Sequence, residues 1–315
     1  MAKRDTHKRI RNWTPDRLPD LSGRTYLITG GNSGIGLEAA RYLANAGGDV
    51  VIAARDAGKA ARAMAELRKT ARGDVHGLAL DLADLSSVRA SADEARARFG
   101  KLDALINNAG IMQTPESTTA DGFELQFGVN HLGHFLYAGL LYDAVEKAGG
   151  RIVSVSSMAH RIGRMNFNDL MFAKGYTPTK AYGQSKLANL LFAQELHRRL
   201  MKAGSPVTAY ACHPGYSDTR LQSTGPEGFL NGFYKVTNAL LAQSATKGAI
   251  PTVLSAAGEE ARPGAYYGPT GFMEARGPVG DARIAPHARR AKDSRTLWER
   301  SEELVDFSWS SVLPG

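Results

Sequence analysis

The sequence predicts an α/β protein in which one doubly wound parallel sheet carries helices on both faces and forms a single domain. From residue 24 onwards, short apolar segments alternate with longer segments of helical character. A glycine-rich turn joins the first apolar segment to the first helical one, and no linker rich in proline or serine divides the chain. Uninterrupted apolar strands that alternate with helices are typical of a parallel sheet that is covered on both faces.

Each element has its own local signal. The expected strands are short apolar runs at 24–29, 49–54, 75–80, 102–106, 151–156 and 207–211. The expected helices carry apolar residues at helical spacing, at 37–45, 57–69, 86–99 and from about 181 to 200. Gly47 and Gly48 end the first helix. Residues 264–272 look turn-rich, and no strand or helix is predicted there.

Composition and charge divide the 315 residues into a main body and two basic ends. Hydrophobic residues make up 43% and charged residues 22%, ordinary values that exclude a disordered, collagen-like or coiled-coil chain. The formal net charge is +8, and most of the excess lies in residues 1–25 and 281–300. We therefore expect a basic N-terminal arm at 1–22, a main domain at 23–280 and a C-terminal segment at 281–315.

The basic ends and the single cysteine bear on partners and location. Solvated ends are the favoured interpretation, and contact with an anionic membrane surface is the open alternative. No nucleic-acid binding is expected, because no zinc finger, basic zipper or RNA-binding aromatic motif is present. Cys212 alone cannot form an internal disulfide and suits a reducing compartment. With no apolar signal segment and no uncharged run apolar enough for a membrane span, a cytoplasmic location is expected.

The glycine-rich turn at residues 29–36 (TGGNSGIG) predicts a dinucleotide site. It lies between a predicted strand and a predicted helix, where glycines allow a tight turn and close approach of a pyrophosphate. The first N–H groups of the helix then face the phosphates. Arg55 lies 19 residues after Gly36, and its guanidinium can pair with a 2′-phosphate. This favours NADP(H), although the carboxylate of the adjacent Asp56 leaves NAD(H) as an alternative.

Two Tyr-x-x-x-Lys pairs offer a tyrosine and a lysine on one face of a helix. They are Tyr176 with Lys180, and Tyr182 with Lys186. Pro178 disfavours a helix at the residue before it, so the first pair is not expected to be helical. Thr179 is predicted to cap the helix that contains the second pair. A surface tyrosine and lysine would be the ordinary interpretation of the second pair alone.

Six motifs in the same order resemble the short-chain dehydrogenase/reductase family. The glycine spacing is Gly-x-x-x-Gly-x-Gly, and the resemblance covers roughly residues 22–220. The other motifs are Asn107-Asn108-Ala109-Gly110, Asn130 in VNHLGHF, Ser157 in VSVSSMAH, Tyr182-x-x-x-Lys186, and Pro214-Gly215. The resemblance implies a Rossmann-type fold, a nicotinamide cofactor and hydride transfer between that cofactor and a carbonyl or alcohol.

The resemblance also implies four catalytic residues, Asn130, Ser157, Tyr182 and Lys186. Tyr182 exchanges the substrate proton, Ser157 polarises the substrate oxygen, Asn130 interrupts a helix and holds a water, and Lys186 contacts the nicotinamide ribose. Ser154 and Ser156 compete with Ser157 for its role. A free tyrosine titrates near pKa ~10. A cation ~4 Å away stabilises the phenolate by at most on the order of 4 kcal/mol, so Lys186 is expected to lower the pKa of Tyr182.

The same resemblance, together with the glycine turn and Arg55, gives the expected cofactor-binding set. It comprises Gly30, Asn32, Ser33, Gly34, Ile35, Gly36, Arg55, Asp81, Leu82, Asn108, Ala109, Gly110, Tyr182, Lys186, Pro214, Gly215, Ser217 and Thr219. No metal site is expected, because His131 and His134 have no acidic or cysteine partner at a recognised spacing.

Substrate and assembly rest on the resemblance to retinol-dehydrogenase-like members. Ser157 and Tyr182 are 25 residues apart, which is similar to the insertion in that branch. A lid at about 220–247, with apolar residues such as Phe229 and Phe233, favours a bulky apolar substrate, while packing on the protein's own core or on a partner subunit is the alternative. The helices that contain Asn130 and Tyr182 often form dimer interfaces in the family, so a homodimer is expected. A catalytically silent NADP(H)-sensing protein is the alternative function.

Overall fold

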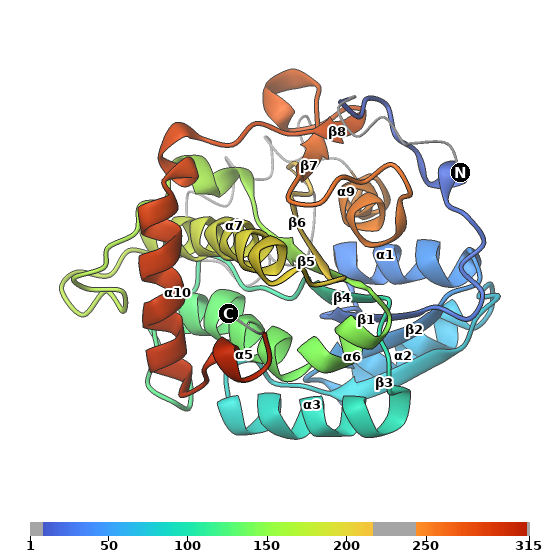
Figure 1. Ribbon diagram of the computed structural model, residues 1–315, viewed down its shortest axis with the longest axis horizontal. Coiled ribbons are helices and arrows are strands. Elements are labelled where there is room, and N and C mark those ends of the chain that lie inside the picture. Colours follow the sequence, from blue (N-terminus) through green and yellow to red (C-terminus); the bar gives the residue numbers. More distant parts are fainter. Residues whose placement is uncertain (1–8, 217–243, 314–315) are drawn as a thin grey trace.

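The structure is a computed structural model that describes residues 9–216 and 244–313. Its centre is one eight-stranded sheet with helices on both faces (Figure 1). The strand order is β3-β2-β1-β4-β5-β6-β7-β8; all neighbours are parallel except β8, which runs antiparallel to β7. The strands are β1 (Thr25–Thr29), β2 (Asp49–Ala54), β3 (Val75–Ala79), β4 (Ala104–Asn107), β5 (Arg151–Val155), β6 (Thr208–Cys212), β7 (Tyr266–Pro269) and β8 (Val279–Asp281).

Two hydrophobic cores lie on the two faces of the sheet. Successive residues of β1 face opposite cores: Leu27 lies in one core, and Tyr26 and Ile28 lie in the other. One core packs against α1 (Gly34–Asn45), α2 (Ala57–Leu67) and α9 (Ala245–Ala257). The other packs against α3 (Leu85–Phe99), α5 (Gly133–Leu140), α6 (Tyr142–Lys147), α7 (Pro178–Ala203) and α10 (Ala291–Val305). The predicted doubly wound α/β fold is therefore confirmed.

The chain crosses from one half of the sheet to the other between β1 and β4. These two strands are neighbours, while β2 and β3 continue outwards on the other side of β1. In such sheets, ligands bind outside the carboxyl ends of the strands at this switch point. The glycine-rich turn follows β1 and the Asn107–Gly110 segment follows β4, so both lie at the switch point.

The cap of the long helix α7 lies two residues before the position predicted from the sequence. Thr177 is extended, with φ −139° and ψ 131°, and Pro178 is the first helical residue. Thr179 is therefore inside the helix, and its prediction as the cap was wrong. Proline suits the first helical position because its fixed φ is helical and its missing N–H has no partner to lose there.

The turn-rich segment at 264–272 contains a strand that the sequence analysis missed. β7 pairs in parallel with β6, and Ala211 lies opposite Tyr266. The expected lid at about 220–247 runs into α9, which begins at Ala245, and its residues 220–243 lie outside the described residues.

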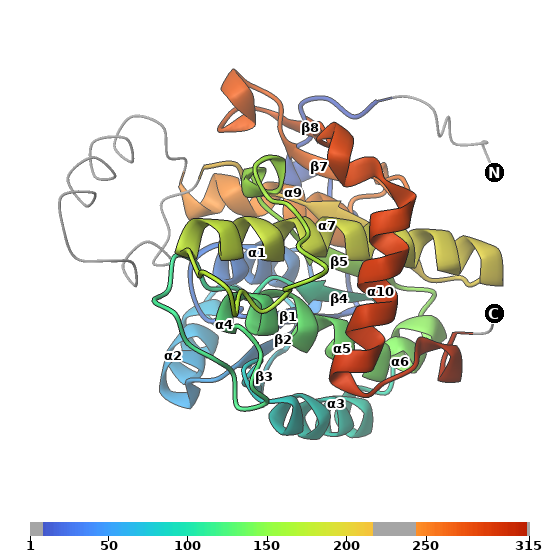
Figure 2. The same ribbon diagram turned by 90° about the vertical axis from the view of Figure 1, so that its left-hand side faces the viewer.

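Both ends of the described chain pack against the central body. Trp13 is 1% exposed and forms an isolated β-bridge with Val279. α10 crosses α7 and α5, and the Trp298 ring stacks on Phe192 with centroids 5.7 Å apart (Figure 2). The division at residues 22 and 280 stays a prediction from sequence. Within the described ranges, no helix is long and apolar enough to cross a membrane.

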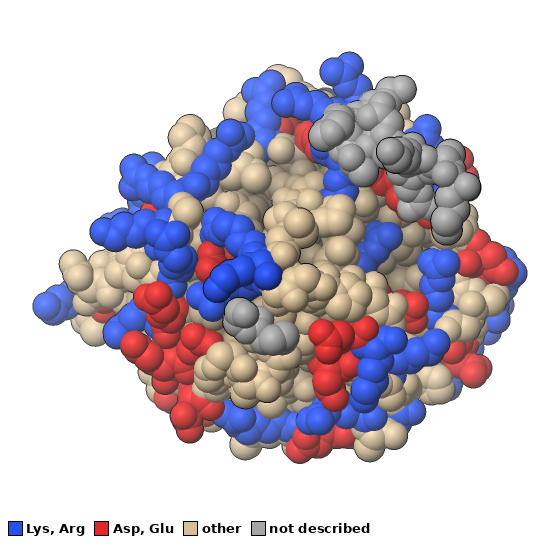
Figure 3. Space-filling view, in the orientation of Figure 1, with Lys and Arg blue, Asp and Glu red and all other residues tan. Residues whose placement is uncertain are grey.

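The face in Figure 3 carries side chains of both charges. Lys and Arg gather at its upper left, and Lys, Arg, Asp and Glu are mixed along its lower rim. The net charge of +8 therefore does not form one uniform basic patch on this face.

Candidate active site

The glycine-rich turn forms a close cradle at the N-terminus of α1. Gly30 has φ +66°, a left-handed conformation that favours glycine, and a Cβ there would lie 3.0 Å from Ala109. A Cβ at Gly36 would overlap the carbonyl oxygen of Gly30. Ser33 is extended before the helix, and its side chain does not cap it. The first N–H groups of α1 are thus left to face an external anion, as a pyrophosphate requires.

The segment after β4 is tied to the end of β1. The Thr29 hydroxyl accepts hydrogen bonds from the backbone N–H groups of Asn108 at 2.9 Å and Ala109 at 3.0 Å. The Asn108 side chain donates to the Thr29 carbonyl at 2.9 Å. Asn107 was not in the expected cofactor-binding set, yet its amide is buried and neither polar atom has a hydrogen-bond partner in the structure. A buried unsatisfied amide at a ligand edge indicates a partner outside the protein.

The residues after β2 bear on the choice between the two cofactor alternatives. Arg55 follows the strand directly, is 75% exposed, and lies 3.7 Å from an Asp81 oxygen. Asp56 instead caps α2, because its carboxylate accepts from the backbone N–H of Lys59 at 2.9 Å and pairs with the Lys59 ammonium at 3.1 Å. The carboxylate that favoured NAD(H) is therefore occupied by its own helix, while the guanidinium remains accessible. Leu82, the next expected residue after Asp81, is buried.

Ser157, Tyr182 and Lys186 come together beyond the carboxyl end of β5. Ser157 begins the short 3₁₀ helix η3 (Met158–Arg161), and its hydroxyl accepts from the N–H of Ala159 at 3.2 Å. The Ser157 side chain also acts on Tyr182, because it lowers the pKa of the phenol. Lys186 lies one turn further along α7, 5.9 Å from the centre of the Tyr182 ring, and donates to the Val155 carbonyl at 3.2 Å.

The competing serines point elsewhere. Ser156 donates to the carbonyl of Lys186 at 2.7 Å, which occupies its hydroxyl within the protein. The Ser154 hydroxyl is buried without a hydrogen-bond partner. Of the three serines, only Ser157 acts on the phenol of Tyr182, whose pKa its side chain lowers, and this favours Ser157.

The protonation of the Tyr182–Lys186 pair differs from the expectation for the protein alone. Burial raises the pKa of Tyr182, and the hydrogen bond from Ser157 lowers it only in part. Burial also lowers the pKa of Lys186 to about 8, because few protein groups compensate its charge. The predicted lowering of the Tyr182 pKa by Lys186 is thus not found here: the ammonium is itself costly to charge, and its hydrogen bond goes to Val155.

Asn130 lies where the helix between β4 and β5 is interrupted. A π-helical turn (η2, Gly128–Leu132) separates α4 (Leu125–Phe127) from α5, in line with the expected interruption. The Asn130 amide exchanges hydrogen bonds with the backbone of Ile111, accepting at 2.8 Å and donating at 3.0 Å, and also donates to Ser185 at 2.9 Å. Asn130 therefore joins the segment after Gly110 to the Tyr182 helix.

Some of the remaining expected residues can be located in the structure, and others lie outside the described residues. Tyr176 precedes α7 and donates to the Thr114 carbonyl at 2.9 Å, so the first Tyr-Lys pair is not a helical pair. Pro214 and Gly215 follow β6, and Gly215 has φ +72°. Ser217 and Thr219 lie outside the described residues. The described ranges hold no cluster of His, Cys, Asp and Glu that suits a metal.

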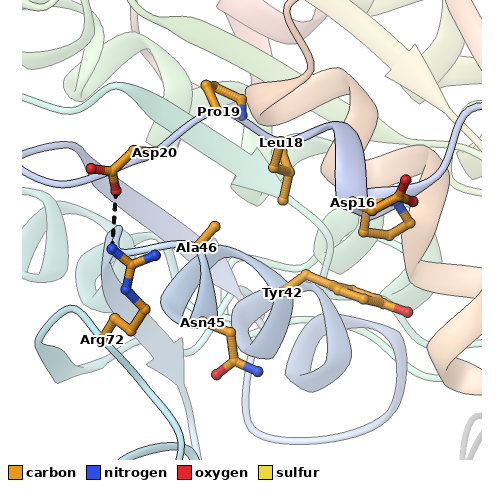
Figure 4. A pocket seen from close by; sticks show the side chains of 9 residues that line it. Asp16, Leu18, Pro19, Asp20, Tyr42, Asn45, Ala46 and Arg72 are labelled. Atoms are coloured by element: carbon orange, nitrogen blue, oxygen red, sulfur yellow. Dashed lines mark ion pairs between the residues drawn. The ribbon is translucent and has the colours of Figure 1, made fainter.

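A separate hollow of roughly 490 Å³ lies away from this constellation. Figure 4 shows its lining, which includes Tyr42, Asn45 and the Asp20–Arg72 pair at 3.5 Å. Tyr42 and Asn45 are at the end of α1, whereas the glycine turn is at its start. The hollow is therefore at the opposite edge of the sheet from the candidate active site.

Comparisons with known proteins show which family the chain belongs to. Residues 24–228 match the family model described as short chain dehydrogenase. Retinol dehydrogenase 12 of Mus musculus is 41% identical over 293 residues, 92% of this chain and 88% of that protein. A solved, uncharacterized protein from Mycobacterium paratuberculosis is 41% identical with a TM-score of 0.79, covering 95% of this chain and 99% of that one. A short chain dehydrogenase from Burkholderia cenocepacia in complex with NADP is 26% identical with a TM-score of 0.62, covering 78% and 96%. The chain therefore belongs to the short-chain dehydrogenase/reductase family, in its retinol-dehydrogenase-like branch.

Proposed function

We propose that this oxidoreductase uses NADP(H) and transfers a hydride between nicotinamide and a carbonyl or alcohol substrate, with Tyr182 as the acid/base. The observation that carries the proposal is the meeting of Ser157, Tyr182 and Lys186 at the carboxyl edge of the sheet, next to the glycine cradle. Bound in that cradle, the nicotinamide supplies or accepts the hydride.

The residues of the cradle fit a dinucleotide. The glycine turn and the start of α1 hold the pyrophosphate, and the Asn108–Gly110 segment borders the adenosine side. Asp81 and Leu82 border the adenine. Gly110 approaches the opposite end of the site, because a Cβ there would lie 3.2 Å from the Lys186 ammonium. Lys186 is therefore placed to donate to the nicotinamide ribose, and Pro214 and Gly215 close the nicotinamide end.

The proton chemistry is derived from the three polar side chains. The N–H of Ala159 occupies one lone pair of the Ser157 oxygen, so the hydroxyl hydrogen is free to donate towards Tyr182 or a substrate oxygen. Tyr182 gives its proton to the substrate oxygen during reduction and takes it back during oxidation. A raised pKa keeps Tyr182 protonated, which suits the reducing direction.

The preference for NADP(H) is supported by the contrast between Arg55 and Asp56. Arg55 is exposed, and its pair with Asp81 at 3.7 Å contributes little stability, so it is available to a 2′-phosphate. Asp56 is engaged with Lys59 and α2.

A bulky apolar substrate is the proposed class, and the relatives named for retinol are its main support. The segment between Ser157 and Tyr182 does not itself argue for an apolar pocket. Phe172 is 7% exposed, and Met165, Phe167 and Met171 pack against the core. Within the described residues, this segment therefore packs against the protein's own core.

The test is turnover of aliphatic, steroidal, retinoid and aromatic carbonyls with NADPH and with NADH. We expect a higher kcat/KM with NADPH, and Arg55→Ala should reduce that preference by roughly tenfold or more, since a charge-assisted hydrogen bond contributes about 1.5–3 kcal/mol. Arg96→Ala is the matched control, because Arg96 is a comparable exposed arginine in the last turn of α3, at the other edge of the sheet. Tight NADPH binding without turnover of any substrate would instead support the silent sensor.

We also propose a location and an assembly for the protein. A cytoplasmic location is tested by cell fractionation, with membrane-bound protein as the contradicting result. A homodimer through α5 and α7 conflicts with the position of α10 over these helices, so we propose that this face is closed within one chain.

A further inference from the structure

His160 lies directly behind Ser157 in the turn after β5. It is fully buried, and its Nδ1 lies 2.7 Å from the carbonyl oxygen of Ser157. The backbone N–H of His160 donates to the same oxygen at 3.1 Å. Because a carbonyl oxygen only accepts, Nδ1 carries the imidazole hydrogen. His160 therefore donates two hydrogen bonds to the Ser157 carbonyl.

The other ring nitrogen connects this turn to the C-terminal segment. With its hydrogen on Nδ1, a neutral imidazole accepts at Nε2, which lies 3.3 Å from the backbone N–H of Ala285. The carbonyl of His160 lies 3.0 Å from Nε2 of His287. Residues 285–287 thus contact both the ring and the backbone of His160, and the N–H of Ala285 favours the tautomer that donates to Ser157.

The surroundings keep this arrangement neutral and rigid. Burial lowers the pKa of His160 to about 4, with further lowering by Arg161 and His287, so the ring is uncharged near neutral pH. The Tyr266 ring packs edge-on against it, with centroids 5.4 Å apart and an angle of 88°. The Tyr266 hydroxyl lies 3.3 Å from Nδ1 of His160 and can accept from it alongside the Ser157 carbonyl. Ser156, the neighbour of Ser157, donates to the carbonyl of Lys186 at 2.7 Å. The layer behind the site therefore contacts the backbones of both Ser157 and Lys186.

We propose that His160 is a positioning residue that orients the Ser157 hydroxyl, with the Ala285 N–H fixing its tautomer; this rests on the proposed role of Ser157. The Ser157 carbonyl belongs to the peptide that leads into η3, whose Ala159 N–H donates to the Ser157 hydroxyl. Rotation of the Ser157–Met158 peptide would displace the start of η3, and with it the Ala159 N–H that donates to the Ser157 hydroxyl. His160 itself touches neither cofactor nor substrate in this proposal.

The first test compares His160→Leu with His160→Asn. Asparagine keeps an N–H donor near the position of Nδ1, whereas leucine keeps only bulk. We expect kcat to fall on the order of 10²-fold in H160L and to recover largely in H160N, since small misplacements of a reacting group cost that much. The Kd for NADPH, from its fluorescence, should stay within about twofold of the parent, because Ser157 does not hold the nucleotide. An H160L enzyme as fast as the parent, or an H160N enzyme as slow as H160L, would overturn the proposal.

Two further readouts separate positioning from a general structural role. Loss of the Ser157 hydrogen bond should raise the apparent pKa of Tyr182 in the pH profile of alcohol oxidation, in H160L as in Ser157→Ala. In the Ser157→Ala background, H160L should cost little more, because both changes remove the same interaction. Fully multiplicative effects, or an unshifted profile in H160L, would show that His160 does not act through Ser157.

If H160L does not fold, the test passes to Ala285. Ala285 has φ −60°, which proline adopts, so Ala285→Pro removes the N–H with little change of backbone. Ala285→Gly keeps the N–H and is the matched control. A lower kcat in A285P than in A285G supports the link, and equal rates contradict it. A parent enzyme without turnover would refute the proposed function, whereas an active parent with unaffected variants refutes only the role of His160.

Discussion

Replacing Tyr182 with phenylalanine removes the one oxygen on which the proposed proton transfer depends. The phenol is hydrogen-bonded to Ser157, and Phe keeps the ring that packs beside Lys186. General acid–base catalysis contributes about 10²–10⁴-fold, so kcat should fall by that factor, equivalent to about 3–5 kcal/mol of barrier. The stability cost should be small, on the order of 1 kcal/mol, because a single hydrogen bond at a partly buried group is lost.

The assay is NADPH-dependent reduction of the best carbonyl found in the substrate panel, measured with NADPH binding and thermal unfolding on the same samples. Tyr176→Phe is the matched control. It also removes a tyrosine oxygen, one that donates to the Thr114 carbonyl and accepts from Gln126, but Tyr176 lies outside α7. We expect Y176F to lose stability and keep its kcat. A Y182F enzyme that retains the parent rate would refute the assignment of the acid/base.

Two further predictions concern stability. Lys186→Met should alter the pH dependence of unfolding. In the parent, the pKa of Lys186 is about 8 in the folded state, below the unfolded value near 10.4. Between these pH values the unfolded parent binds more protons than the folded parent, so the free energy of unfolding of the parent rises with pH. Denaturant unfolding from pH 8 to 10 should show a gain on the order of 2 kcal/mol in the parent over K186M, and parallel curves would contradict the lowered pKa. Trp298→Ala should lower the free energy of unfolding by about 3–5 kcal/mol, because this 1% exposed ring stacks on Phe192 and lies under Arg199; a loss below about 1 kcal/mol would contradict its role in holding α10.

The central sheet could be predicted because its signals are local. The six predicted strands agree with β1 to β6 to within about two residues, since each is a run of apolar residues next to a turn. β7 carried the opposite local signal, with Gly268 and Pro269 in a strand of four residues. Gly268 is required for close packing and does not form a turn, because a Cβ at this position would overlap the His213 ring. That contact depends on the register of β7 against β6, which lies beyond the reach of local pattern.

The positions of several candidate site residues in the fold could be predicted from the sequence, but their electrostatics could not. Spacing alone placed Tyr182 and Lys186 on one helical face, and Arg55 after the second strand. The pKa of Tyr182 depends on how deeply its neighbours are buried, and the engagement of Asp56 depends on where α2 begins. The role of His160 could not be predicted from its motif, because its partners Ala285 and His287 are more than 120 residues away in the sequence.

The helix α10 has a consequence for how the enzyme responds to dilution. Where the Tyr182 helix is braced by a second subunit, its rigidity follows the subunit concentration by mass action. Here the supporting helix, α10, belongs to the same chain: Trp298 packs on Phe192, and Ser301 hydrogen-bonds to His131 at 2.9 Å. We therefore expect specific activity to stay constant from micromolar to nanomolar enzyme. In chains cut before residue 291, specific activity should depend on enzyme concentration. The exposed aromatic surface of such chains would be buried only by association with another molecule.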